Sequence, residues 1–197
     1  MSMNRRDAAK VLAVAPVAAA FRWAPESVRE AAALAREALD RQTPFKPKFF
    51  TAHEWRSVRV LVDLIIPADE QSGSATQAGV PEFIDFMCVD DKSLQTPLRG
   101  GLAWLDTASH ESFGKAFVDG TAADQAGLLD RIAWPKKAKP EDAQGAAFFT
   151  SFRDLTASGF YSSRMGVHDL KYIGNTFVPE WKGCPPEALA KLGVRYP

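Results

Sequence analysis

The strongest constraint on the fold is that apolar residues recur at helical spacing between clear start and stop signals. Thr51 and Glu54 form a capping box, in which each side chain can satisfy an otherwise unpaired backbone amide at a helix start. Apolar residues then recur at helical spacing until Pro67, which cannot continue a helix. No stretch alternates as a strand would. We therefore predict an all-α fold, a compact helical bundle.

The same signals predict a bundle of about five main helices in residues 51–159. Further helix starts occur at Val80-Pro81, Thr96-Pro97, Thr121 and Pro140. Gly100 and Gly101 are expected to allow a neighbouring helix to approach closely, and Gly159 is expected to close the last helix.

Two flanking regions are predicted to differ from the bundle. Residues 25–50 are expected to form a helix and a linker, and the apolar stripe of that helix is thin enough to lie on the body or on a partner. Residues 160–197 are rich in glycine and proline, which predicts an irregular arm with a short helix near residues 187–192.

The amino-terminal residues 1–24 have the features of an export signal. Arg5 and Arg6 precede an apolar run, Val11 to Phe21, that is too short to cross a bilayer as a helix. An arginine pair before a weakly hydrophobic, alanine-rich segment is typical of the twin-arginine route, and we expect a signal helix here. Asp7 to Ala9 lacks the usual bulky apolar pair, so an amphipathic helix with a chance arginine pair is the alternative. Cleavage near Ala18 to Ala20 is left open.

The composition excludes several functional classes. Lysine and arginine together number 24, as do aspartate and glutamate, so the basic excess typical of nucleic-acid binders is missing. Cys88 and Cys184 stand in no zinc or haem spacing, so we expect no metal and no covalent haem in this chain. A GxGxxG turn is also absent, which argues against binding of FAD in the dinucleotide-fold manner.

Candidate catalytic residues are sparse. His53, His110 and His168 lie far apart, with no carboxylate at metal-ligand spacing. An unfamiliar enzyme site built from Asp69, Asp85 and His110 is therefore the weakest of the functions considered.

The order of several short motifs resembles the gluconate 2-dehydrogenase subunit 3 family, the small subunits of periplasmic sugar and polyol dehydrogenases. The resemblance covers nearly the whole chain. Its most specific parts are the arginine-pair leader, Phe49-Phe50-Thr51 with Glu54, Asp63 to Asp69, Gly79-Val80 with Phe83 to Asp85, Gly101 to Asp106, Phe148-Phe149, Gly159 to Ser163, Tyr172 to Asn175 and Gly183-Cys184.

The resemblance implies a chain that is not itself an enzyme and carries no cofactor. It would accompany a large FAD-containing dehydrogenase subunit of the glucose-methanol-choline type, supply its export signal to the periplasm and stabilise it. A c-type cytochrome, with haem c, would commonly accept the electrons. A transient export chaperone for the same flavoprotein is the alternative.

Contacts with that partner are expected from the carboxy-terminal arm. The aromatic candidates are Phe160, Tyr161, Tyr172 and Trp181. Cys184 is predicted to lie exposed in an oxidising compartment, where it would form a disulfide with the large subunit or with Cys88.

Overall fold

A computed structural model describes residues 23–41, 44–172, 179–180 and 183–195. Within these residues the chain forms α-helices and short 3-10 helices and no strand, which confirms the all-α prediction. The α-helices are α2 (Pro25–Asp40), α3 (Ala52–Ile65), α4 (Val80–Asp90), α5 (Gln95–Phe113), α6 (Ala122–Ile132), α7 (Ala143–Ser162), α8 (Arg164–Asp169) and α9 (Pro186–Leu192). The 3-10 helices are η1 (Lys92–Leu94), η2 (Phe117–Asp119) and η3 (Pro140–Asp142).

The predicted start signals lie at the N-termini of the observed helices. Thr51 and Glu54 form the capping box of α3, and Thr121 and Asp124 form a second one at α6. Proline occupies the first turn of α2 and α4, where its missing amide would have had no partner in the helix. Local sequence therefore determines where these helices begin.

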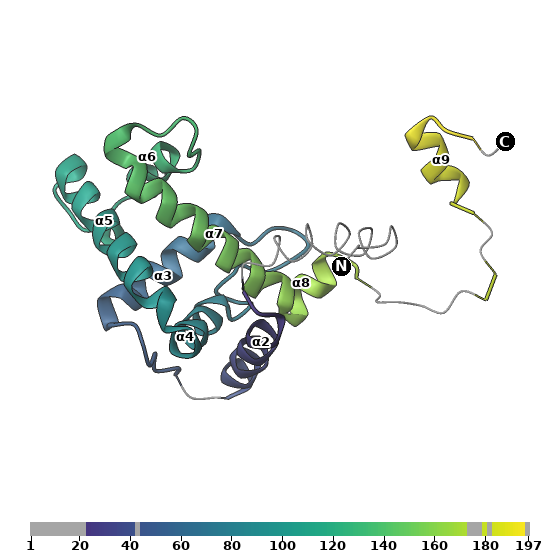
Figure 1. The fold of residues 1–197 in the computed structure, drawn as a ribbon, viewed down its shortest axis with the longest axis horizontal. Helices are drawn as coiled ribbons and strands as arrows, with labels where there is room; N and C mark the ends of the chain where they lie inside the picture. Colours follow the sequence, from purple (N-terminus) through teal and green to yellow (C-terminus); the bar gives the residue numbers. More distant parts are fainter. Residues whose placement is uncertain (1–22, 42–43, 173–178, 181–182, 196–197) are drawn as a thin grey trace, which may run out of the picture.

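The long helix α7 is the centre of the bundle. It contacts α2, α3, α4, α5, α6 and α8, and it crosses the body diagonally in Figure 1. The core around it is aromatic and aliphatic. Its largest fully buried side chains are Phe83, Phe117, Phe152, Phe160, Leu61, Ile84, Met87, Leu105, Leu128, Ile132, Leu155 and Val58.

Two glycines allow helices to meet closely. A methyl group at Gly101 would lie 1.9 Å from the ring of Phe148, so α5 meets α7 only because that position has no side chain. A methyl group at Gly159 would lie 2.7 Å from the ring of Phe83. Gly159 was expected to close its helix, but α7 continues to Ser162. The role of this glycine is instead to leave room for the ring of Phe83 on α4. Gly100 has nothing within 4 Å of such a methyl group.

A buried carboxylate attaches the linker to the bundle. Asp85 of α4 is fully buried and accepts hydrogen bonds from three consecutive backbone amides, those of Lys48, Phe49 and Phe50, at 2.8, 2.9 and 3.2 Å. Arg99 of α5 adds a hydrogen bond of 2.8 Å to the carbonyl of Phe49 and lies over its ring. The segment before α3 is therefore part of the packed body.

The described structure also shifts the expected regional boundaries. Helix α2 packs on α4 and α7 through buried Ala31 and Ala35, so it lies on the body even though its apolar stripe is thin. Regular structure continues past Gly159 through α8, so most of residues 160–169, which were expected to open the irregular arm, are helical.

Candidate interaction surface

The loop between α3 and α4 is held in place by its own polar side chains. Asp63 of α3 accepts a hydrogen bond of 2.7 Å from the amide of Thr76. Asp69 accepts bonds of 2.8 Å from the amides of both Ser72 and Gln71, and these amides lower the pKa of its carboxyl group. The Asp63 to Asp69 motif therefore builds a fixed turn.

The three residues of the hypothetical enzyme site have separate surroundings. Asp69 caps a turn, Asp85 is occupied by three amides, and His110 is exposed on the last turn of α5. Among the described residues, no group of three or more His, Cys, Asp or Glu side chains could hold a metal ion. The geometry gives Asp69 and Asp85 structural roles.

One polar pair was not anticipated from the sequence. His53 Nε2 of α3 lies 2.6 Å from Asp106 Oδ2 of α5, and Asp106 Oδ1 accepts a bond of 3.0 Å from the amide of Phe117. The two side chains are 53 positions apart in the chain, so no local pattern could have indicated the contact. The pair fastens α3 to α5 and η2.

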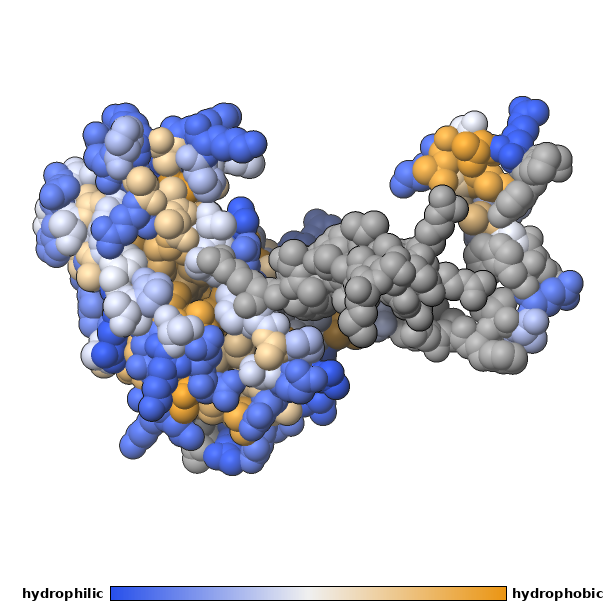
Figure 2. All heavy atoms as spheres, in the orientation of Figure 1, coloured by the Kyte–Doolittle hydropathy of each residue, from blue (hydrophilic) through white to orange (hydrophobic). Residues whose placement is uncertain are grey.

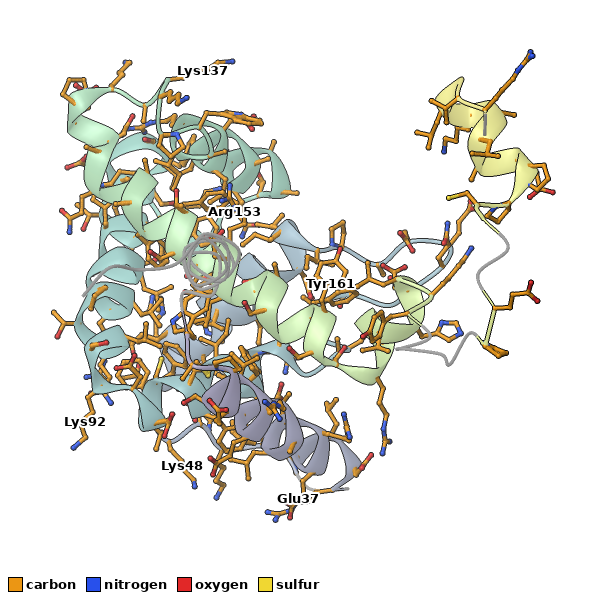
Figure 3. All side chains as sticks on the ribbon, turned by 45° about the vertical axis from the view of Figure 1, so that its right-hand side comes forward. Glu37, Lys48, Lys92, Lys137, Arg153 and Tyr161 are labelled. Carbon is orange, nitrogen blue, oxygen red and sulfur yellow. The ribbon has the colours of Figure 1, made fainter. Side chains whose placement is uncertain are left out.

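Exposed apolar side chains gather where α7 ends and α8 turns. Tyr161 near the end of α7 is 44% exposed and Val167 of α8 is exposed, and the exposed residues Leu170 and Tyr172 (65%) follow directly after α8. Tyr161 lies at this end of α7 in Figure 3. We call these four residues the α8 patch. Large exposed aromatic side chains in a group are typical of an interaction site.

The charge beside the α8 patch is mainly basic. A hollow of about 560 Å³ at this end is lined by Arg164, His168 and Lys171, with Asp169 as its single carboxylate. Lys171 has a positive φ of 52°, which turns the chain after α8 towards the arm. A partner with apolar side chains and carboxylates would complement this end.

The predicted contact residues fall into three groups. Tyr161 and Tyr172 are exposed in the patch, as expected for contact residues. Phe160 is only 1% exposed and packs in the core, because it lies on the inward face of α7, so the structure corrects that assignment. Trp181, like Arg5 and Arg6, lies outside the described residues.

The arm carries a second apolar surface. Helix α9 stands away from the bundle in Figure 1 and has no buried residue. Leu192 is 71% exposed, and Val194 is exposed just beyond the helix. A seven-residue helix has little stability of its own in water, and a surface that packed against α9 would stabilise it.

The two cysteines lie in different surroundings. Cys88 is buried in α4, and burial, assisted by nearby Asp85 and Asp91, raises the pKa of its thiol. Cys184 is exposed on the arm, two residues before α9. A bridge between them would require α4 to open, whereas Cys184 is accessible to a partner.

These features define an all-helical protein with an exposed patch and an arm, and among the described residues no helix is long and apolar enough to span a membrane. Comparison with family models assigns it further: residues 52–179 match gluconate 2-dehydrogenase subunit 3. The chain belongs to this family, and is an accessory subunit of a dehydrogenase complex. No curated protein and no solved structure matches it.

Proposed function

We propose that the chain is the non-catalytic small subunit of a periplasmic FAD-dependent sugar or glycoside dehydrogenase of the glucose-methanol-choline type. It binds and stabilises the large subunit, and it supplies the twin-arginine signal with which the pair is exported. A c-type cytochrome with haem c takes the electrons from the flavin.

The observation that carries this proposal is the α8 patch together with the arm. The patch exposes aromatic and aliphatic side chains, and α9 has no buried residue and leaves Leu192 exposed. Interfaces of stable complexes are enriched in such aromatic residues. In our proposal the large subunit covers the patch and packs against α9.

The leader is assigned to export on its sequence. Arg5 and Arg6 followed by the uncharged run Val11 to Phe21 are the features that a twin-arginine receptor would read. A folded complex with FAD already bound requires a route that carries folded proteins, and the twin-arginine route does so.

Co-expression of the full chain with an FAD-dependent dehydrogenase large subunit, sought in the neighbouring reading frame, tests the proposal. We expect the two chains to co-elute from the periplasmic fraction on size-exclusion chromatography, with flavin absorbance in the same peak. Arg5→Lys together with Arg6→Lys should leave both proteins in the cytoplasm, since the receptor distinguishes guanidinium from ammonium groups.

Three results would contradict the proposal in different ways. A chain that elutes alone, without flavin, would argue against a permanent subunit, and association restricted to the cytoplasm would indicate a chaperone. Sugar oxidation by the purified chain alone would indicate an enzyme. Normal export of the double lysine variant would contradict only the export assignment.

A further inference from the structure

A second apolar feature lies between α5 and α7, away from the arm. It is a groove of about 450 Å³ whose lining includes Leu98 and Gly101 of α5 and Phe148 and Leu155 of α7. The Phe148 ring lies against Gly101 and forms part of the floor, and one edge is open at Gly100, where an added β-carbon would meet no heavy atom of the neighbouring elements within 4 Å. Apolar side chains form a band over this part of the body in Figure 2.

The groove is uncharged. The residues that line it include no Asp, Glu, Lys, Arg or His, and its polar members are Thr96, Gln144 and Ser151. A charged side chain buried here would lose its hydration without gaining an ionic partner. The groove therefore suits an uncharged, aliphatic segment.

The chain itself carries such a segment at the edge of the groove. Trp23 is one of the lining residues, and only Arg22 separates it from Phe21. Because two residues span at most about 7 Å, the apolar run is joined by a short connection to a residue that lines the groove. From Val11 to Phe21 the run contains no charged residue.

We propose that this groove is the docking site for residues 11–21 of the chain's own leader. Tethering through Trp23 gives the segment an effective concentration in the millimolar range, so even weak contacts hold it on the body. A leader that is bound in the groove competes with any receptor that must engage the same apolar residues. The groove thereby regulates how much of the leader is accessible on the folded chain.

Limited proteolysis of the full chain tests this. Elastase cuts after small aliphatic residues, which are abundant in residues 11–21. Gly100→Leu places a side chain at the open edge of the groove, where its β-carbon meets no heavy atom of the neighbouring elements within 4 Å. Gly127→Leu on α6 is the matched control, since that position is also open but lies outside the groove.

We expect Gly100→Leu to speed cleavage within residues 11–21 by about tenfold, because proteolysis follows the population of the exposed segment. Gly127→Leu should cleave at the wild-type rate. A photo-crosslinker at position Val14 should form adducts with the peptide that spans residues 144–155, and Gly100→Leu should abolish them.

Equal cleavage rates in all three proteins would overturn the proposal, as would crosslinks confined to another part of the chain. Unchanged cleavage combined with loss of the flavoprotein from the Gly100→Leu complex would instead make the groove a partner site. Both primary measurements use the isolated chain, so their failure leaves the proposed subunit function untouched.

Discussion

The centre of the molecule around α4 and the end around α8 and α9 differ in whether their apolar side chains are buried or exposed. On α4, Phe83 and Ile84 are buried against other helices and the Asp85 carboxylate is occupied by three amides. In the α8 patch, Leu170 and Tyr172 are exposed beside a basic hollow. The apolar side chains of the centre are covered by other helices of the chain, whereas among the described residues the end leaves apolar side chains exposed, which is typical of an interaction site.

Among the substitutions that test this contrast, we expect the largest loss of stability at Asp85. Asp85→Ala leaves three amides without their acceptor, two of them in buried bonds, and should lower the free energy of unfolding by about 3 kcal/mol or more. Urea denaturation of the full chain measures the loss. Asp90→Ala, at an exposed position on the same helix, should change stability by no more than about 0.5 kcal/mol. Similar losses in the two variants would show that the linker is not held by Asp85.

Neighbouring glycines on α5 provide the next test of packing in the centre. Gly101→Ala drives a methyl group into the Phe148 ring and should cost about 1–3 kcal/mol. Gly100→Ala meets open space in a helix and should stabilise the chain by about 0.5–1 kcal/mol, because alanine loses less backbone entropy. Thermal unfolding of both variants checks the opposite signs. A Gly101→Ala variant as stable as Gly100→Ala would mean that the two helices can separate without cost.

Glu82 makes the stability of the centre depend on pH. Its side chain is 6% exposed, its Oε2 atom has no hydrogen-bond partner among the described residues, and burial raises its pKa. Because the folded pKa lies above the ordinary value of 4.5, the contribution of this group to stability is complete below that pH. It is lost as the pH rises through the raised pKa, when the carboxylate must ionise in a buried site.

Glu82→Gln should remove this dependence. We expect wild type to lose stability relative to the variant as the pH rises from below 4.5 towards neutral, because only wild type must ionise a buried carboxyl group. Urea unfolding of both proteins across that range gives the difference, in which the titration of all other groups cancels. A difference that does not change with pH would place the Glu82 carboxylate in contact with solvent.

Local sequence signals predicted the helix starts of the centre, but not the contacts between residues that are far apart in the chain. The capping boxes at Thr51 and Thr121 are read directly from the sequence because all their partners lie within three residues. The role of Asp85 could not be predicted, since the amides that it binds lie 35 to 37 positions away. Gly159 was misinterpreted for the same reason, because its neighbour Phe83 comes from another helix.

The sequence indicated which aromatic residues lie near the α8 end, but not which of them are exposed. Its aromatic residues were predicted to contact the partner, yet the helical spacing that buries Phe160 and exposes Tyr161 was overlooked. That spacing is a signal which the sequence does contain, since Phe160 follows Phe149, Phe152 and Thr156 on one face of α7. The spacing predicts a buried Phe160 once the helix is taken to continue beyond Gly159.

The smallest effect on folding is expected in the arm. Cys184→Ser and Tyr172→Ala should each change the free energy of unfolding of the isolated chain by less than about 0.5 kcal/mol, because both side chains are exposed. Their effects should appear only in the complex. Tyr172→Ala should weaken co-elution with the flavoprotein, while Trp134→Ala, an equally exposed aromatic far from α8, should not.

Cys184→Ser isolates the covalent part of that contact. If Cys184 bonds to the large subunit, non-reducing electrophoresis of the wild-type complex shows one band at the summed mass, which separates on reduction and is absent from the serine variant. Two bands without reductant would contradict the linkage, and an oxidised single chain would point to Cys88 instead. That second outcome would require the buried face of α4 to open, and would therefore also lower the stability of the centre. The pairing of Cys184 thus tests whether the arm is bound to the large subunit, as is proposed for the α8 patch, or to the core of its own chain through Cys88.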